Sequence, residues 1–396
     1  MIDIVNESYE QDFSADVARI AVLGVGGGGG NAVGRMIGKN SPNISYMVMN
    51  TDSAALAKSP ATTKVKLGAK LTGGLGAGGR PEVGERAAEE SSAEIKQALE
   101  GINMVFITAG MGGGTGTGAA PVIAKIAREM NILTVGVVTK PFMFEGNKRM
   151  KNALQGIENL KEYVDTLIVV PNQKLLDRAE NTTTMQDAYA MADDVLKQGV
   201  IGISDLITKP GEINVDFADV CTVITNQGLA HFGIGEANNV IEAARLAIDS
   251  PLIETSIKGA KNVILNFTSG PSLNLIEVNE AAGLISNSID PDAEFIFGTV
   301  VDDNMGDKVK VTIIATGLSS ENENQTSAQN SFNNDNNRID NNSMSSIVSS
   351  SRNNNPQPNS NSQYQPQREY NNYNNNGYNR NYEDEDISIP RFMRNK

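Results

Sequence analysis

The chain has 396 residues and a formal net charge of −14, with a sequence pI near 4.7. So acidic a balance argues against nucleic acid and against an anionic membrane surface as main partners, because both require a basic face. One cysteine and one histidine exclude an internal disulfide and any chemistry that needs several histidines. The acidic arm at residues 1–18 lacks the features of a signal peptide, and no apolar run reaches transmembrane length, so we expect a cytoplasmic protein without membrane insertion.

The first predicted strand, residues 19–25, runs into a glycine turn at residues 26–30, ahead of a helix predicted over 32–37. The turn fits the pattern G-x-G-x-x-G, and Asp52 follows the next predicted strand, where a dinucleotide enzyme has its ribose-binding acid. Taken alone, this pattern predicts an NAD-dependent dehydrogenase.

A second glycine cluster, residues 73–79, precedes Arg80 and a single long helix predicted over 82–100. A mobile loop explains such a cluster, and binding of a phosphate near Arg80 is the alternative. By itself the cluster does not decide between them.

The third glycine cluster is the most informative stretch of the chain. A buried strand over 104–109 leads into residues 110–118, where Thr115 and Thr117 alternate with glycines, and a helix follows. We expect Pro121 in the first turn of this helix, where the missing N–H of proline costs nothing. A helix that starts in this way offers free backbone donors, and hydroxyl groups beside them, to an anion.

Further strands at 133–140 and 166–172 alternate with helices at 147–164 and 185–204. Such alternation predicts an α/β protein with a doubly wound, mostly parallel sheet. Since the carboxyl ends of parallel strands meet at one edge, two phosphate-binding turns there favour a ligand with several phosphates in a row over a dinucleotide. The motif G-x-x-x-x-G-K-[ST] of ordinary P-loop enzymes does not occur in the sequence.

From residue 205 to residue 318 the pattern predicts a smaller α+β domain of about four strands, with two helices on one face. The last two strands, 294–301 and 308–316, are expected to form a hairpin. The remaining predicted elements are a strand at 221–225, a helix at 237–248, a strand at 262–268 and a helix at 275–288.

Beyond residue 318 the composition shifts to Asn, Ser, Gln and Pro, which predicts a disordered linker over 319–382. Residues 383–396 contain an acidic run and then four apolar side chains, at 387, 389, 392 and 393. Apolar side chains at the end of a polar arm indicate a peptide that docks on a protein partner.

Three stretches of the chain together resemble the FtsZ family of bacterial cell-division GTPases, the prokaryotic relatives of tubulin. Residues 112–118 are similar to the glycine-rich signature loop of the tubulin superfamily, 214–219 to the synergy loop of the family, and 389–394 to its C-terminal peptide. The resemblance extends over residues 19–318. It implies a GTP-binding domain at 19–184, a long linking helix at 185–204, and the synergy loop with a smaller second domain at 205–318.

The same resemblance implies the residues of a GTP/GDP site. Those expected at the phosphates are Gly27, Gly28, Gly29, Gly30, Asn31, Gly114, Thr115, Gly116 and Thr117, with the loop 76–79 covering the γ-phosphate. Glu145 is expected at the ribose, Arg149 at the edge of the phosphates, and Tyr189 stacked on the guanine, which Asn172, Asp193 and Asp194 would read. The family more often has Phe at position 189, and stacking survives this change. It more often has Asn at position 193, where Asp adds negative charge near the base, so we expect Asp194 to be the main contact of the base.

Asp216 and Asp219 are three residues apart and could share one face of a helix or turn, where they would orient a water. The resemblance implies that they reach the nucleotide of the next subunit in a head-to-tail filament, so that hydrolysis depends on polymerisation. Mg²⁺ is expected with the nucleotide, whereas the residues that would hold a metal stay unknown. The resemblance further implies adaptor proteins for the C-terminal peptide and a location at the division site. Two alternatives stay open: the dehydrogenase, and a GTP-binding scaffold that does not hydrolyse its nucleotide.

Overall fold

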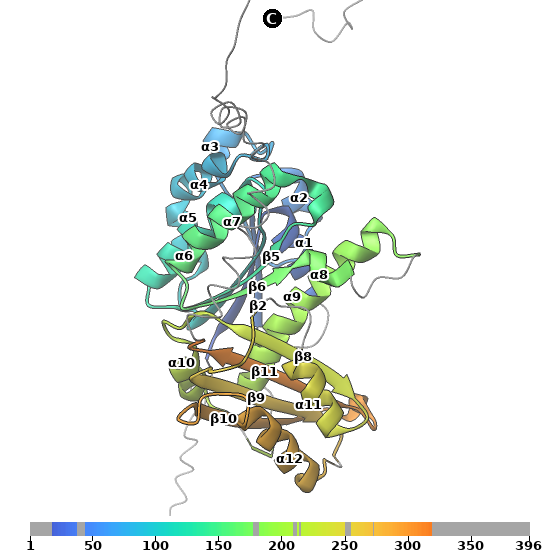
Figure 1. The fold of residues 1–396 in the computed structure, drawn as a ribbon. Coiled ribbons are helices and arrows are strands. Elements are labelled where there is room, and N and C mark those ends of the chain that lie inside the picture. Colours follow the sequence, from blue (N-terminus) through green and yellow to red (C-terminus); the bar gives the residue numbers. More distant parts are fainter. Residues whose placement is uncertain are drawn as a thin grey trace, which may run out of the picture. The chain divides into compact units, whose positions relative to one another are not determined.

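The computed structural model describes residues 18–37, 44–176, 182–208, 212–213, 215–249, 255–271 and 273–318. The predictions for residues 1–17, for the linker at 319–382 and for the docking peptide at 383–396 lie outside this part and stay predictions. The described residues all belong to one compact unit. Within it they form two sheets and the helices that cover them (Figure 1).

The first sheet has seven parallel strands in the order β3-β2-β1-β4-β5-β6-β7. Its central strands are short apolar runs buried over most of their length, as expected for a parallel sheet covered on both faces. The strands are β1 (Ile20–Val25), β2 (Ile44–Asn50), β3 (Thr63–Lys66), β4 (Met104–Gly110), β5 (Leu133–Lys140), β6 (Thr166–Pro171) and β7 (Gly228–Leu229). This architecture confirms the predicted doubly wound sheet.

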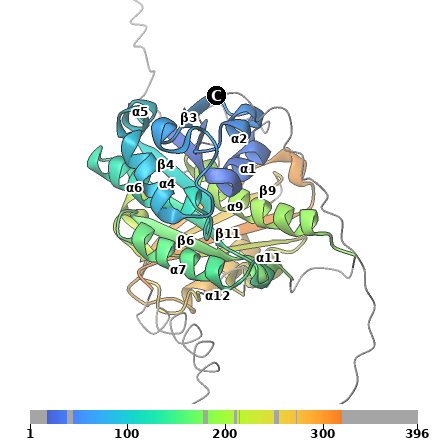
Figure 2. The same cartoon turned by 90° about the horizontal axis from the view of Figure 1, so that it is seen from above.

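Alternate residues of each strand pack on opposite faces, because side chains along a strand have a period of two. In β1, Ile20 and Val22 join a cluster with α1 and α9, whereas Ala21 and Leu23 join a cluster with α4 to α7. Helices α1 and α9 lie side by side, as do α4 and α6 (Figure 2). The helices and turns of this part are α1 (Gly26–Met36), α2 (Ser53–Lys58), α3 (Ala69–Thr72), α4 (Pro81–Glu90), α5 (Ser92–Ala98), α6 (Thr115–Glu129), η1 (Met143–Glu145), α7 (Asn147–Lys161), α8 (Asn172–Leu175) and α9 (Met185–Thr208).

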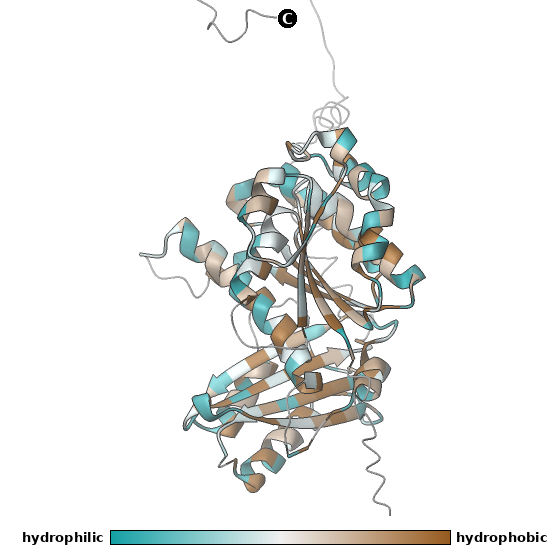
Figure 3. Cartoon of the chain, turned by 180° about the vertical axis from the view of Figure 1, so that it is seen from behind, coloured by the Kyte–Doolittle hydropathy of each residue, from teal (hydrophilic) through white to brown (hydrophobic). Residues whose placement is uncertain are grey.

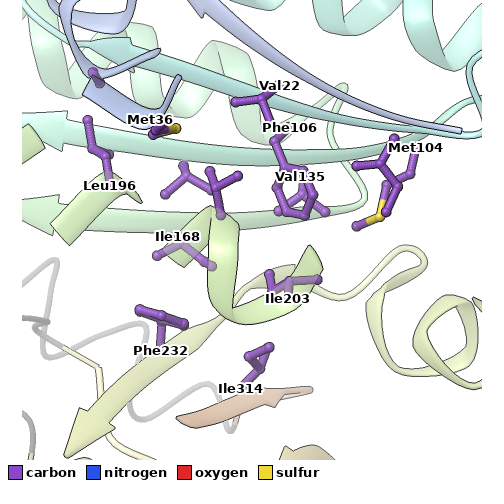
Figure 4. Packing of buried hydrophobic residues seen from close by; sticks show 14 of the residues in the cluster. Val22, Met36, Met104, Phe106, Val135, Ile168, Leu196, Ile203, Phe232 and Ile314 are labelled. Atoms are coloured by element: carbon purple, nitrogen blue, oxygen red, sulfur yellow. The ribbon is translucent and has the colours of Figure 1, made fainter. Parts of the chain in front are cut away.

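The long helix α9 packs between the two sheets. Leu196 and Ile203 of this helix belong to one buried cluster that contains Ile168 of the first sheet and Phe232 and Ile314 of the second (Figure 4). A shared apolar core of this kind holds both sheets against the same helix.

The second sheet has four strands in the order β10-β9-β11-β8, and hydrophobic residues run along them (brown in Figure 3). One face packs on α9, and the other packs on α11 and α12 in a separate cluster, which confirms the predicted α+β domain with two helices on one face. Its elements are α10 (Phe217–Ile224), β8 (His231–Ala237), α11 (Val240–Ile248), β9 (Asn262–Ser269), α12 (Leu275–Ser286), β10 (Glu294–Val301), η3 (Asp303–Met305) and β11 (Val309–Thr316).

Among the described helices, none is long and apolar enough to cross a membrane.

The predicted strand at 221–225 is wrong, because residues 217–224 form α10. The run of Val and Thr favours a strand locally. However, Val220, Val223 and Ile224 recur at helical spacing and are all buried, and Asp216 caps the start of the helix. Tertiary burial together with the cap overrides the strand propensity.

The predicted hairpin of β10 and β11 is also wrong, because β9 lies between these strands. β10 pairs with β9 in parallel, and β11 pairs with β9 antiparallel. β10 is consequently an edge strand, which explains why its first half is only partly buried.

The single helix predicted over 82–100 is divided in two at Ser91. The buried hydroxyl of Ser91 accepts a hydrogen bond from the backbone N–H of Gly68 at 3.0 Å. This contact fixes the junction of α4 and α5 against the segment that follows β3 and satisfies the buried N–H of Gly68.

His231 lies at the start of β8 and is 1% exposed. Burial lowers its pKa to about 4, although the carbonyl oxygen of Thr255, 2.8 Å from Nδ1, opposes this shift. The imidazole is therefore neutral in the folded protein at neutral pH.

We expect the titration of His231 to make stability depend on pH. Because its folded pKa is lower than that of the unfolded chain, the contribution is complete above about pH 6.5 and is lost as pH falls through about 4. His231→Gln removes the titration, so between about pH 8 and pH 5 the wild type should lose about 2 kcal/mol more unfolding free energy than the variant. Urea unfolding followed by circular dichroism measures both, and equal pH dependence would contradict this account.

Candidate nucleotide-binding site

The glycine run after β1 forms the first turns of a helix. α1 begins at Gly26, not near Ala32 as the sequence predicts. A Cβ atom on Gly29 would lie 2.1 Å from the carbonyl oxygen of Thr108, and one on Gly24 would lie 2.4 Å from the carbonyl oxygen of Gly29. Only glycine allows α1 to pack so closely on β1 and β4, and the free N–H groups of its first turn are therefore glycine N–H groups.

The start of α6 lies directly beside the start of α1. α6 begins at Thr115 after Gly114, and a Cβ atom on Gly26 would lie 2.8 Å from the backbone nitrogen of Gly116. Two sets of free N–H donors and two positive helix ends thus meet at the carboxyl edge of the first sheet. The expectation that Pro121 lies in the first turn of this helix is wrong, because α6 already begins at Thr115 and Pro121 lies inside it.

The two threonines of the third glycine cluster hold its turn together. Thr117 Oγ1 accepts a hydrogen bond from the N–H of Gly112 at 2.8 Å, and Thr115 Oγ1 lies 2.6 Å from Thr51 Oγ1 at the end of β2. Thr117 thus closes the turn, while Thr115 fixes the turn to the neighbouring strand. Both hydroxyl groups keep further hydrogen-bonding capacity for a ligand.

The glycine cluster at 73–79 lies against the same place. A Cβ atom on Gly114 would lie 2.8 Å from Cβ of Ala77 and 2.9 Å from the backbone nitrogen of Arg80. Gly76 N–H also donates to the carbonyl oxygen of Thr51. All three glycine clusters therefore converge at one place. The sequence alone did not show whether the cluster at 73–79 would join the other two.

Next to the helix starts is a cavity with polar side chains, formed by the ends of β5 and β6 and by α9. Its lining includes Glu145, Arg149, Asn172, Tyr189 and Asp193. Asn172, the first residue after β6, is buried, and its Oδ1 has no hydrogen-bond partner within the described part of the chain. A buried acceptor without a partner is costly, so this atom fits a site whose ligand supplies a donor.

Glu145 connects this cavity to the backbone and to Arg149. Its Oε1 accepts a hydrogen bond from Phe142 N–H at 2.8 Å, and its Oε2 lies 3.0 Å from Nη1 of Arg149. Arg149 packs on the third glycine cluster, since a Cβ atom on Gly112 would lie 2.7 Å from Cγ of Arg149. The guanidinium is thus held between the cavity and the start of α6.

An aromatic group closes one side of the cavity. Tyr189 contacts Phe142 edge to face at 5.4 Å, and Phe142 stacks on Phe144 at 5.0 Å. Burial, together with the neighbouring Glu145, raises the pKa of Tyr189, which is therefore protonated at neutral pH. Its ring is partly exposed and offers a face on which a planar base can stack.

Of the two neighbouring aspartates, the structure brings Asp193 rather than Asp194 into the cavity. Burial raises the pKa of Asp193 to about 6, and Arg35, whose Nη1 is 3.4 Å from its Oδ2, opposes the shift. Asp194 lies on another side of α9, where Gln198 donates to it at 2.7 Å. Asp194 thus lies outside this cavity, and its expected role as the main contact of a base stays a prediction.

Asp216 and Asp219 form a capping box at the start of α10. Asp219 N–H donates to Asp216 Oδ1 at 2.7 Å, and Asp216 N–H donates to Asp219 Oδ2 at 3.2 Å. The C-terminal end of α10 lies at the opposite edge of the first sheet from the glycine clusters, because Thr166, the first residue of β6, donates to the carbonyl oxygen of Ile224. The two acids thus share one helix start, and their helix packs far from the cavity of their own chain.

Sequence reasoning missed Arg35 and Phe142. Arg35 lies far from Asp193 in the sequence, and no local pattern connects them. Phe142 is buried two residues after the end of β5. Its position next to Pro141 and before two exposed apolar residues was the signal available in the sequence.

Together, the fold and the cavity define an α/β protein of a nucleotide-binding class, in which two helix starts meet beside a polar cavity. Residues 19–180 match the GTPase domain of the Tubulin/FtsZ family, and residues 228–319 match the C-terminal domain of the FtsZ family. An FtsZ from M. jannaschii, solved as an empty dimer, is 45% identical, with a TM-score of 0.73 over 76% of this chain and 89% of that one. A tryptophan-to-tyrosine mutant of FtsZ from the same organism matches with the same identity and TM-score, over 76% of this chain and 92% of that one.

The chain therefore belongs to the FtsZ family, and its first domain is a GTPase domain that binds GTP and GDP. CetZ2 from Haloferax volcanii, solved as a GTPγS-bound protofilament, shares the fold at 21% identity and a TM-score of 0.67, covering 80% of this chain and 99% of that one. The predicted NAD-dependent dehydrogenase is wrong. Asp52, the supposed ribose ligand, caps α2 by accepting from the N–H groups of Ala54 and Ala55.

We expect Gly27→Ala to weaken GTP binding at least tenfold, since an added methyl group would keep phosphate oxygens from the first turn of α1. The variant should fold normally, because no heavy atom lies within 4 Å of the new Cβ position. Gly283→Ala is the matched control, since its position in α12 is equally open and belongs to the second domain. Nucleotide titration and thermal melting test both, and unchanged GTP affinity in Gly27→Ala would contradict this account of the phosphate site.

Proposed function

We propose that this chain is a self-assembling GTPase of the cell-division ring, in which GTP bound by one subunit is hydrolysed with acids of the next. The observation that carries the proposal is the meeting of the starts of α1 and α6, where the Cβ position of Gly26 is 2.8 Å from Gly116 nitrogen. A row of phosphates suits two adjacent sets of backbone donors better than a single pyrophosphate does.

Phosphoryl transfer to water needs charge stabilisation and a positioned water more than it needs covalent chemistry. In our proposal the N–H groups of residues 27–31 and 114–117 hold the phosphates, and Arg149 neutralises their edge. Mg²⁺ would be bound mainly by phosphate oxygens, as this ion prefers. No group of three or more His, Cys, Asp or Glu side chains suited to a metal occurs among the described residues.

The guanine base would occupy the cavity beside α9. Tyr189 provides a ring for stacking, Asn172 supplies an amide, and the Asp193 carboxylate can accept from both donor groups of guanine. Glu145 lies between base and phosphates, where a ribose hydroxyl could donate to it. We therefore prefer Asp193 to Asp194 as the residue that reads the base.

Hydrolysis in trans is supported by the separation between the cavity and α10. β6 has six residues and spans about 20 Å. The cavity lies at the carboxyl end of this strand, and Ile224 at the end of α10 is bonded to its amino end. Asp216 and Asp219 are better situated to meet the nucleotide of another subunit than their own, in a head-to-tail arrangement that continues as a filament.

Exposed apolar side chains support self-association. Near the glycine clusters, Leu75 is 90% exposed and Phe144 is 55% exposed. In the second domain, Leu275 at the start of α12 is 79% exposed. Large exposed apolar residues of this kind mark contact surfaces, and the related FtsZ of M. jannaschii was solved as a dimer.

The C-terminal peptide would connect such a filament to adaptor proteins at the division site in the cytoplasm. The linker at 319–382 is long enough for this role, since a flexible chain of that length spans about 45 Å. The apolar residues at 387, 389, 392 and 393 would be the docking contacts.

Mixing two inactive variants tests hydrolysis in trans. Asp216→Asn keeps an oxygen that can cap α10 and removes only the charge, so it should bind GTP normally and hydrolyse it at least tenfold more slowly. Arg149→Ala should lose nucleotide binding. An equal mixture should regain about a quarter of wild-type turnover, because one junction in four pairs an intact cavity with an intact acid.

The measurement is phosphate release across a protein dilution series, with each variant alone as control. Wild-type turnover per subunit should rise with protein concentration. If co-assembling variants recover no turnover, catalysis in trans is wrong. GTP binding without turnover at any concentration would instead favour the scaffold.

Deleting residues 387–396 tests the role of the tail. Because this segment follows a long linker, GTP turnover should stay within about twofold of wild type, whereas binding to adaptor proteins should be lost. Phosphate release and co-sedimentation with an adaptor measure the two effects. Loss of turnover in the truncated chain would mean that the peptide is needed by the folded domains.

A further inference from the structure

Arg35 has a position that the phosphate site alone does not explain. It lies in the last turn of α1, the same helix whose first turn carries the glycines of the phosphate site. Its Nη1 lies 3.4 Å from Oδ2 of Asp193 on α9. The side chain of Arg35 is 43% exposed, whereas that of Asp193 is 13% exposed, so the pair joins a solvated cation to a largely buried carboxylate.

The surroundings of Asp193 make its ionised form costly. Burial raises its pKa to about 6, and Arg35 is the charged group that opposes this shift. Glu145 and Arg149 face the same cavity from η1 and α7, but they pair with each other at 3.0 Å. The other polar side chains of the cavity, Tyr189 on α9, Asn172 on α8 and Thr139 of β5, are uncharged at neutral pH.

The protonation state of Asp193 decides what it can recognise. A carboxylate accepts two hydrogen bonds and matches the adjacent N–H donors of guanine, whereas a protonated acid or an amide accepts one and donates one. A site built to accept from two N–H groups discriminates strongly against a base that lacks one of them.

We propose that Arg35 is a positioning and specificity-determining residue, which keeps the Asp193 carboxylate charged and aimed at the base so that guanine is selected near and below neutral pH. The inference rests on the proposed role of Asp193 as the residue that reads guanine. Since Arg35 and the phosphate-binding glycines belong to one helix, the same rigid element sets the positions of both ends of the nucleotide.

The experiment measures the dissociation constants of GTP and xanthosine triphosphate from pH 5 to pH 8 at protein concentrations below assembly. The variants are Arg35→Ala, Arg35→Lys and Asp193→Asn. Arg86→Ala, which removes an exposed charge from α4, is the matched control. Asp193→Asn also provides the baseline, since the phosphates of the nucleotide titrate in the same range.

Wild-type affinity for GTP should be constant at high pH and should fall, relative to the baseline, as pH drops through about 6. In Arg35→Ala the midpoint of this fall should move to higher pH by roughly one unit, because an adjacent positive charge is lost. Arg35→Lys should restore most of the shift, and Arg86→Ala should resemble wild type. Asp193→Asn should show little pH dependence beyond that of the phosphates and should prefer xanthosine triphosphate.

Three outcomes would overturn the inference, and they differ in what happens to the proposed base site. If Arg35→Ala has the wild-type midpoint while Asp193→Asn changes base preference, Arg35 has no such role, although the proposed base site stands. If Asp193→Asn binds GTP with wild-type affinity and selectivity, the assignment of Asp193 fails and the inference fails with it. A uniform loss of affinity in Arg35→Ala at every pH, not rescued by lysine, would indicate a merely structural role and would also overturn the inference.

Discussion

The close approach of α1 to the first sheet is the constraint on which the site depends. Side chains at Gly24 or Gly29 would collide with backbone atoms at 2.4 Å and 2.1 Å, so the helix can start at the edge of the sheet only because these residues lack a Cβ atom. The same closeness brings α1 against α6 at Gly116, and α6 against the loop at Ala77 through Gly114. Three segments that are separate in the sequence thereby present backbone donors at one place, without a lysine of the P-loop kind.

The two acids that we propose to orient water, Asp216 and Asp219, do not lie beside the backbone donors of their own chain. The acids suited to that task cap α10, whose far end is tied to the amino end of β6. The long helix α9 and the buried cluster around Leu196, Phe232 and Ile314 hold this separation rigidly. In our proposal a second subunit completes the catalytic site, so that turnover depends on assembly.

The sequence allowed the alternation of strands and helices, the two sheets and the glycine turns to be predicted, since each follows from local apolar patterns. Prediction from the sequence failed where contacts between distant residues determine the secondary structure or the strand order. The run Val220 to Thr225 has strand propensity, yet burial and the cap at Asp216 make it helical. β9 enters between β10 and β11 because pairing order is a property of the whole sheet. The sequence also could not show that Asp193 rather than Asp194 faces the cavity, because this depends on which side of α9 meets it. The contact of Asp193 with Arg35 joins residues that are far apart in the sequence.

The most direct test of this account is a cryo-electron microscopy structure of filaments assembled with a slowly hydrolysed GTP analogue. The account predicts phosphates against the first turns of α1 and α6, the base between Tyr189 and Asp193, and the partner subunit's Asp216 as the carboxylate nearest the γ-phosphate. A γ-phosphate surrounded only by residues of its own chain would contradict the account, as would a nucleotide bound away from the two helix starts.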